Sequence, residues 1–280
     1  MAAIATQTAP APAPAPVAAR RRGPLPVWRW VILLIAGIYF LLPLYAAIRF
    51  VGIKAYGDLI SAPGFTSALW LSIRLAIVTT VITLALMLPT TVYVHLKLPG
   101  LRRLLESLTI LPIVIPPVVL ATGLLQVAPA SLKDTPYLLA LEYVVLAMPF
   151  AYRTIDAGLR ALDLKTITEA SNSLGAGWTR TLLTVILPNL VTALLAATVL
   201  TVALVLGEYT ISSLALYTTF PVWLVTNDQT SAPITVAGSI FALVVTWLVL
   251  LVITVVGTRR GRRTGRQVSL FTVTRQDNRG

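Results

Sequence analysis

The chain has 280 residues, of which 57% are hydrophobic and 11% are charged, and its formal net charge is +12. Soluble domains carry about 25% charged residues, so this composition excludes an ordinary soluble protein. The chain contains no cysteine, which excludes disulfides and thiolate metal sites. Its apolar runs are continuous and of spanning length, and they indicate an integral membrane protein built from helices.

Residues 1–26 contain an Ala-Pro repeat, which predicts an extended, disordered tail. Six apolar segments follow, and we expect them to form an all-α, polytopic membrane domain over residues 27–258, with its core at 67–257. The predicted spans are Trp28–Phe50, Ser67–His95, Leu104–Val127, Tyr137–Ile155, Leu182–Leu206 and Pro233–Gly257. The third contains three prolines, which we expect a packed membrane helix to tolerate. Residues 259–280 form a second, basic tail.

The positive charges are distributed unevenly between the loops of this domain. If the N-terminus is cytoplasmic, 18 of the 22 Lys and Arg residues lie in the two tails or in the loops at 95–104 and 152–181. Cytoplasmic loops of membrane proteins carry such an excess, so we expect both termini and these loops to be cytoplasmic. The charge is then explained by topology and by attraction to anionic lipid, without a nucleic-acid partner.

The stretch Glu169–Pro188 interrupts the apolar pattern within the longest predicted cytoplasmic loop. Its small residues would let another surface approach closely, and they are Ala170, Ser171, Ser173, Gly175, Ala176 and Gly177. We expect a short helix capped by Thr166 or Thr168, with Glu169 in its first turn and a left-handed Gly175 at its end. The residues alone leave two interpretations equally open: a knob that docks on a soluble partner, and an ordinary connection.

A resemblance favours the first interpretation. The stretch resembles the signature loop of the membrane (permease) subunits of binding-protein-dependent ABC importers with the type I fold. That signature is Glu-Ala-Ala, three residues, Gly, nine residues, Ile, any residue and Leu-Pro. The matching positions here are Glu169, Ala170, Ser171, Gly175, Val185, Leu187 and Pro188. Ser171 and Val185 depart conservatively from the pattern, and the resemblance extends over Ser67–Gly257.

The resemblance implies that this loop is a coupling helix that docks on a cytoplasmic ATPase. Glu169 would be its polar anchor, Ala170 and Ser171 would permit close contact, and Gly175 would form the turn. Ala176, Gly177 and Pro188 complete the implied coupling loop. The implied partners are an ABC ATPase dimer, a second permease subunit forming a heterodimer, an extracytoplasmic solute-binding protein and membrane lipids. The implied location is the bacterial inner (cytoplasmic) membrane.

The sequence lacks the motifs of an enzyme. No phosphate-binding loop of the form Gly-x4-Gly-Lys-Ser/Thr is present, and no His-Glu-x-x-His motif for zinc. We therefore expect no catalytic residues, no metal and no cofactor in this chain, with ATP bound by the partner ATPase. The chain is predicted to be a transport subunit without an ATPase site of its own.

The solute is predicted from a narrower resemblance and from two carboxylates. The runs Leu-Pro-Ile-Val-Ile-Pro-Pro and Leu-Gly-Glu-Tyr-Thr resemble the polyamine, phosphonate, iron, thiamine, sulfate and molybdate branch of these permeases. Glu142, Glu208 and Tyr209 would suit an organic cation, which favours a spermidine/putrescine-type importer. Interfacial carboxylates without contact to solute are the plainer interpretation. Alternative functions are import of phosphonate, iron, thiamine or sulfate, an ion-coupled secondary transporter, and a membrane scaffold without transport.

Overall fold

The computed structural model describes residues 27–228 and 231–273, and the predicted N-terminal tail lies outside them. Within these ranges the chain is helical, without a β-strand. The chain divides into two units, residues 1–46 and 47–280. Most of α1 (Val27–Phe50), an apolar helix of spanning length, belongs to the first. The all-α prediction is confirmed.

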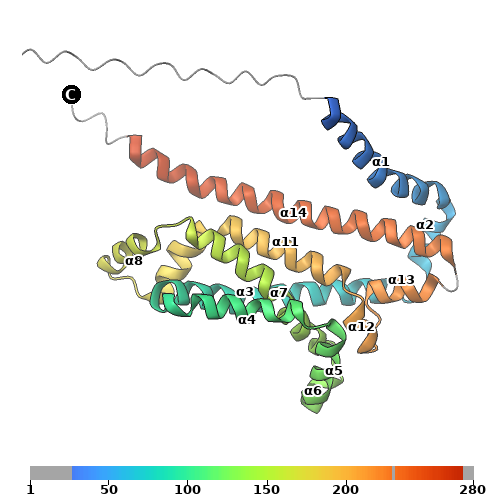
Figure 1. Ribbon diagram of the computed structural model, residues 1–280, viewed down its shortest axis with the longest axis horizontal. Helices are drawn as coiled ribbons and strands as arrows, with labels where there is room; N and C mark the ends of the chain where they lie inside the picture. The colour runs from blue at the N-terminus through green and yellow to red at the C-terminus, as the bar shows by residue number, and fades with distance from the viewer. Residues whose placement is uncertain (1–26, 229–230, 274–280) are drawn as a thin grey trace, which may run out of the picture. The chain divides into compact units, whose positions relative to one another are not determined.

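The second unit contains the remaining elements in the order shown by the colours of Figure 1. They are α2 (Ile53–Ser61), α3 (Phe65–Lys97), η1 (Pro99–Leu101), α4 (Arg102–Val114), α5 (Pro117–Val127), α6 (Ala130–Lys133), α7 (Tyr137–Arg160), α8 (Leu164–Ser173), α9 (Trp178–Thr181), the π-helical turn η2 (Leu182–Ile186), α10 (Leu187–Asn189), α11 (Val191–Gly207), α12 (Thr210–Leu214), α13 (Phe220–Asp228) and α14 (Ala232–Val273).

The centre of this unit is the packing of α3, α7 and α11, with α4 against α7 and α14 against α11. Helices approach closely in membranes where their facing residues are small. On α7 these are Ala140, Ala147 and Ala151, and on α11 Ala197, all fully buried. At Gly158 of α7 an added Cβ would lie 2.6 Å from Cβ of Ala193. The sequence of α7 therefore fixes how near α11 can lie.

Two of the predicted spans are broken rather than continuous. α4 and α5 meet at 100°, so the expectation of one unbroken helix over Leu104–Val127 was wrong. The break falls at Pro116–Pro117, where two consecutive residues lack the amide hydrogen and the preceding residue is driven to an extended conformation. Single prolines at Pro89 and Pro149 remain inside α3 and α7.

The second break separates Trp178–Asn189 from α11 at an angle of 78°. The fifth predicted span therefore begins at Val191, and Pro188 lies before it, in α10. Among the residues that the structure describes, four helices are long and apolar enough to cross a membrane, or up to six if each bent pair counts as one span. α14 continues as a helix past the predicted span end at Gly257 to Val273.

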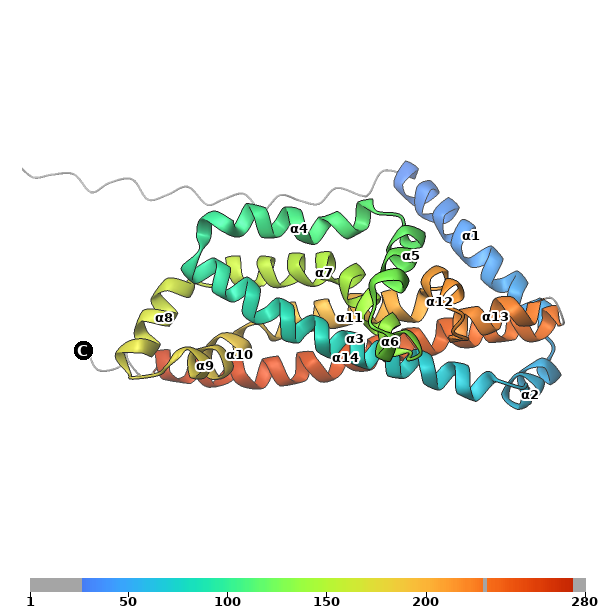
Figure 2. The same ribbon diagram turned by 90° about the horizontal axis from the view of Figure 1, so that it is seen from below.

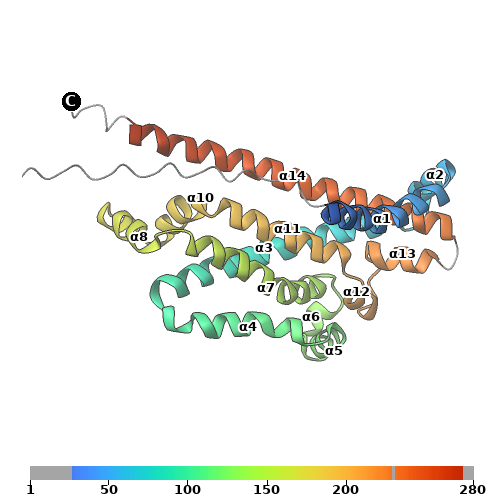
Figure 3. The same ribbon diagram turned by 45° about the horizontal axis from the view of Figure 1, so that its top comes forward.

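The ends of the long helices separate into two groups. Figures 1, 2 and 3 all place α8, α9 and α10 at one end of the second unit, with α2 and α13 at the other. The turn between α3 and α4 and the C-terminal end of α7 lie at the α8 end. The two loops that the charge pattern assigned to one side of the membrane therefore do lie at one end of the unit.

Candidate docking segment and solute pathway

The short helix α8 forms within the loop that carries the signature. Its N-cap is Asp163, whose carboxylate accepts hydrogen bonds from the amide of Thr166 at 3.3 Å and from its hydroxyl at 2.7 Å. These hydrogen bonds lower the pKa of Asp163. Thr166 and Thr168 are not the cap, and Glu169 lies in the second turn rather than the first. Those two details of the sequence prediction were wrong.

The end of α8 follows the prediction. Gly175 has φ +77°, the left-handed conformation that glycine adopts without steric cost. The amide of Gly175 donates to the carbonyl of Asn172 at 2.9 Å, and the amide of Ala176 donates to the carbonyl of Ser171 at 3.1 Å. This pair of hydrogen bonds is the Schellman arrangement that ends a helix and satisfies its last carbonyl groups.

The coupling-loop residues divide between an outer and an inner face. Glu169 and Ala170 are exposed, and Leu174 is 88% exposed. Ser171 is buried, with its hydroxyl 2.8 Å from that of Thr181 on α9. Ser171 therefore fastens α8 to α9 and does not lie on the exposed side of α8. Gly177 is exposed at the start of α9, whereas Ala176 and Pro188 are half-buried.

A pocket of about 720 Å³ lies beside α8. Its lining combines the end of α3 with α8 and α9: His95, Leu96, Lys97, Leu164, Lys165, Thr168, Glu169, Asn172, Trp178 and Thr181. One wall is held by an edge-on contact between Trp178 and Tyr93, with ring centroids 6.0 Å apart. Lys165, Thr168, Glu169 and Asn172 of α8 thus border this recess, whereas Ala170 is exposed and is not part of its lining.

A charged cluster that the sequence analysis missed lies at the same end. Asp156 of α7 contacts His95 at 2.9 Å, Arg102 at 2.8 Å and Arg160 at 2.7 Å. The spacing of Asp156 and Arg160 by one helical turn was the available signal. His95 and Arg102 could not be assigned to it, because their proximity depends on how α3, α4 and α7 pack.

Glu208 has a structural role in this arrangement. Its carboxylate accepts hydrogen bonds from the hydroxyl of Tyr143 at 3.0 Å and from the amides of Ile211 and Ser212 at 2.7 and 3.2 Å. It therefore ties the first turn of α12 to α7. The chain neighbour of Glu208, Tyr209, is 41% exposed.

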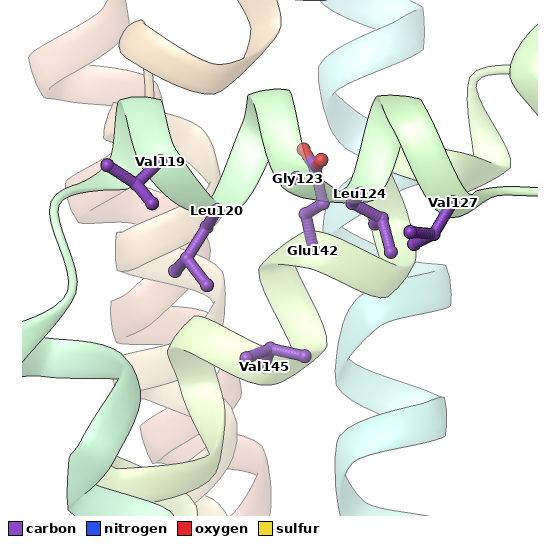
Figure 4. A pocket seen from close by; sticks show the side chains of 7 residues that line it. All are labelled: Val119, Leu120, Gly123, Leu124, Val127, Glu142 and Val145. Carbon is purple, nitrogen blue, oxygen red and sulfur yellow. The ribbon is translucent and has the colours of Figure 1, made fainter.

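Glu142 differs sharply from Glu208. It is buried, and neither carboxylate oxygen has a hydrogen-bond partner. It lines a pocket of about 240 Å³ between α5 and α7 whose other walls are apolar: Val119, Leu120, Gly123, Leu124, Val127 and Val145. Figure 4 shows its carboxyl group reaching from α7 toward α5. Burial of an unpaired carboxylate is costly, so this group needs either a proton or a bound partner.

Comparison with known proteins identifies the class. Residues 99–266 match the family described as the binding-protein-dependent transport system inner membrane component. The chain belongs to this family, whose members are the membrane permease subunits of ABC importers and carry no ATPase site. The predictions of an ABC importer permease and of a multi-pass protein in the inner membrane are thereby confirmed.

Individual relatives and structures agree with this class. The molybdenum transport system permease protein ModB of Mycobacterium bovis is 28% identical over 204 residues, covering 66% of this chain and 76% of ModB. ModB of Mycobacterium tuberculosis matches equally. A bacterial ABC transporter involved in alginate import has a TM-score of 0.62 at 14% identity, covering 85% of this chain and 94% of that chain. A second structure, in complex with alginate pentasaccharide-bound periplasmic protein, has a TM-score of 0.63 at 15% identity and covers 85% and 95%.

Proposed function

We propose that this permease subunit forms half of a translocation pore and docks through the outer face of α8 on a cytoplasmic ATPase dimer. The observation that carries the proposal is the form of α8. It is a separate short helix, capped at both ends, whose exposed side has the small residue Ala170 and the carboxylate Glu169. Because it lies at the end of the unit where α3, α4 and α7 meet, a force applied to it reaches several spans at once.

The remaining partners follow from this role. A second, different permease subunit would complete the pore, and an extracytoplasmic solute-binding protein would deliver the solute. The positive-charge pattern supports an orientation with α8 and both termini in the cytoplasm. ATP would be bound by the ATPase alone, so we expect the isolated chain to be inactive in ATP hydrolysis.

The test is a substitution on the outer face of α8. Ala170→Trp places a large side chain where close contact is proposed, and we expect loss of ATPase co-purification and of transport. Thr66→Trp, at an exposed position at the start of α3, is the matched control and should retain co-purification of the ATPase. Equal amounts of ATPase co-purifying with the two variants would contradict docking through α8.

For the solute, we propose a small organic cation of the polyamine class. Glu142 supports this, because it is a buried carboxylate without a partner in a pocket of the spanning region. Glu208 no longer contributes, since its oxygens are occupied by Tyr143 and the start of α12. The competing solute is an oxyanion, which is favoured by the 28% identity to molybdenum transport permeases.

Solute-stimulated ATP hydrolysis and solute uptake by the reconstituted transporter distinguish the two solutes. We expect spermidine or putrescine to stimulate ATP hydrolysis and molybdate to leave it unchanged. Glu142→Gln, which retains the size of the side chain, should weaken polyamine uptake by about tenfold, the effect of losing one charged contact. Stimulation by molybdate alone would replace the cation with an oxyanion and leave the permease role intact.

A further inference from the structure

Asp156 takes part in every ion pair among the residues that the structure describes. Its side chain is only 10% exposed. Oδ1 accepts hydrogen bonds from Nε and Nη2 of Arg102 at 3.1 and 2.8 Å and lies 2.9 Å from Nε2 of His95. Oδ2 contacts Arg160 at 2.7 Å. Three basic side chains therefore converge on one largely buried carboxylate.

These contacts join the ends of three different helices. His95 lies in the last turn of α3, Arg102 is the first residue of α4, and Asp156 lies one turn before the end of α7. A second link reinforces the junction, because the hydroxyl of Tyr152 donates to the carbonyl of Arg102 at 3.4 Å. Asp156 thus holds the turn between α3 and α4 against α7.

The junction is placed between α8 and the broken span. Only residues 161–163 separate the end of α7 from the start of α8. On the other side, α4 leads directly into the break at Pro116–Pro117 and then into α5, which forms a wall of the Glu142 pocket. A displacement of α8 therefore reaches α7 through this short connection and α9 through their packing, and the contacts of Asp156 are a direct route from α7 to α4.

We propose that Asp156 is a positioning residue that transmits movement of α8 to α4 and the broken span through Arg102. This inference rests on the proposed docking of α8. Its physical basis is the strength of charge-assisted hydrogen bonds away from water and the repulsion that would remain without the carboxylate. If Asp156 were neutral, the guanidinium groups of Arg102 and Arg160 would lose their shared carboxylate, and the α3–α4 turn would be held less firmly against α7.

The contrast between the two arginines makes the proposal testable. Arg102 belongs to α4 and makes two hydrogen bonds with Asp156 across the helix boundary. Arg160 lies on the same helix as Asp156, one turn away, and its side chain is 55% exposed. Both neutralise the same carboxylate, but only Arg102 joins it to another helix. A role in neutralising a buried charge predicts similar effects for both, whereas transmission predicts a large effect for Arg102 alone.

The experiment uses the complete transporter, with its ATPase and solute-binding protein, reconstituted in lipid vesicles. It measures ATPase co-purification, basal ATP hydrolysis, and the stimulation of hydrolysis by the solute-loaded binding protein. We expect Asp156→Asn and Arg102→Gln to lower the stimulation by about tenfold while basal hydrolysis and co-purification persist. Arg160→Gln should retain most of the stimulation. Asp156→Glu, which keeps the charge, should recover part of it.

Other results of this experiment would contradict the inference in different ways. Equal loss in Arg102→Gln and Arg160→Gln would overturn transmission and leave charge neutralisation. Normal stimulation in Asp156→Asn would overturn the inference while the docking proposal stands. If Asp156→Asn does not accumulate in the membrane, the two arginine variants decide between the alternatives. If the wild-type chain itself fails to co-purify an ATPase, the docking proposal fails, and this inference with it.

Discussion

The end of α8 requires a left-handed backbone conformation at Gly175. Its φ of +77° is unfavourable for other residues, and β-branched side chains tolerate it least. An added Cβ would meet nothing within 4 Å in this chain. Any effect of substitution on the free subunit therefore comes from the backbone conformation rather than from a clash.

This distinction gives a prediction for Gly175. Gly175→Val should destabilise the end of α8 by about 1–3 kcal/mol and release the ATPase subunit. Gly175→Asn, a residue that enters the left-handed region more readily, should retain much of the binding. Co-purification of the ATPase with each variant is the measurement. Equal retention in Val and Asn variants would show that the left-handed end is dispensable.

Glu208 gives a second prediction at the residue scale. Glu208→Gln replaces one acceptor oxygen by an amide group, so at least one hydrogen bond from Tyr143, Ile211 or Ser212 is weakened. We expect lower thermal stability, by about 1–3 kcal/mol, whether or not solute is present. Tyr209→Phe is the control, since it removes only a partly exposed hydroxyl. Unchanged stability accompanied by loss of polyamine uptake would instead return Glu208 to the solute pathway.

At the scale of elements, the close approach of α7 to α11 depends on Gly158. A methyl group there would lie 2.6 Å from Cβ of Ala193 and 3.0 Å from a methyl group of Leu190. Leu190 is the residue at which the bent pair ending in α11 turns. Substitution at Gly158 therefore disturbs both the packing of the two helices and the break beside it.

The prediction is that Gly158→Ala lowers stability by about 1–3 kcal/mol through overpacking. Gly57→Ala in α2 is the matched control, because nothing lies within 4 Å of its added Cβ and alanine favours the helix. We expect this control to be neutral or stabilising. Thermal unfolding of the purified subunit in detergent measures both variants, and equal stability would contradict the packing argument.

The elements also show what sequence can and cannot predict here. Apolar length and basic flanks are local properties, so the positions of the spans and the loop containing α8 were recognisable. The break at Pro116–Pro117 was visible as a proline pair but was misjudged, because membrane helices do retain single prolines such as Pro149. The contacts of Asp156 with His95 and Arg102 were beyond prediction, since these partners come from distant helices. The same holds for the contact of Glu208 with Tyr143, whereas the other partners of both carboxylates lie only three or four residues away.

In the unit comprising residues 47–280, the docking region and the buried Glu142 lie in different places. The end with α8 carries the charged cluster and the outer face proposed for docking, whereas Glu142 lies nearer the start of α7, against the broken span. The helices α3, α7 and α11 connect the two regions. We therefore expect the soluble ATPase to contact α8 and not the opposite end, which the proposed orientation leaves to the solute-binding protein.

The most direct test is site-specific cross-linking, which is favoured by the absence of cysteine from the chain. Ala170→Cys introduces one thiol on the outer face of α8, and Ile53→Cys introduces one at α2, where Ile53 is 92% exposed. In membranes containing the complete transporter, we predict that a short thiol-reactive cross-linker joins Ala170→Cys, but not Ile53→Cys, to the ATPase subunit. Cross-linking of the ATPase to Ile53→Cys with none to Ala170→Cys would contradict the account.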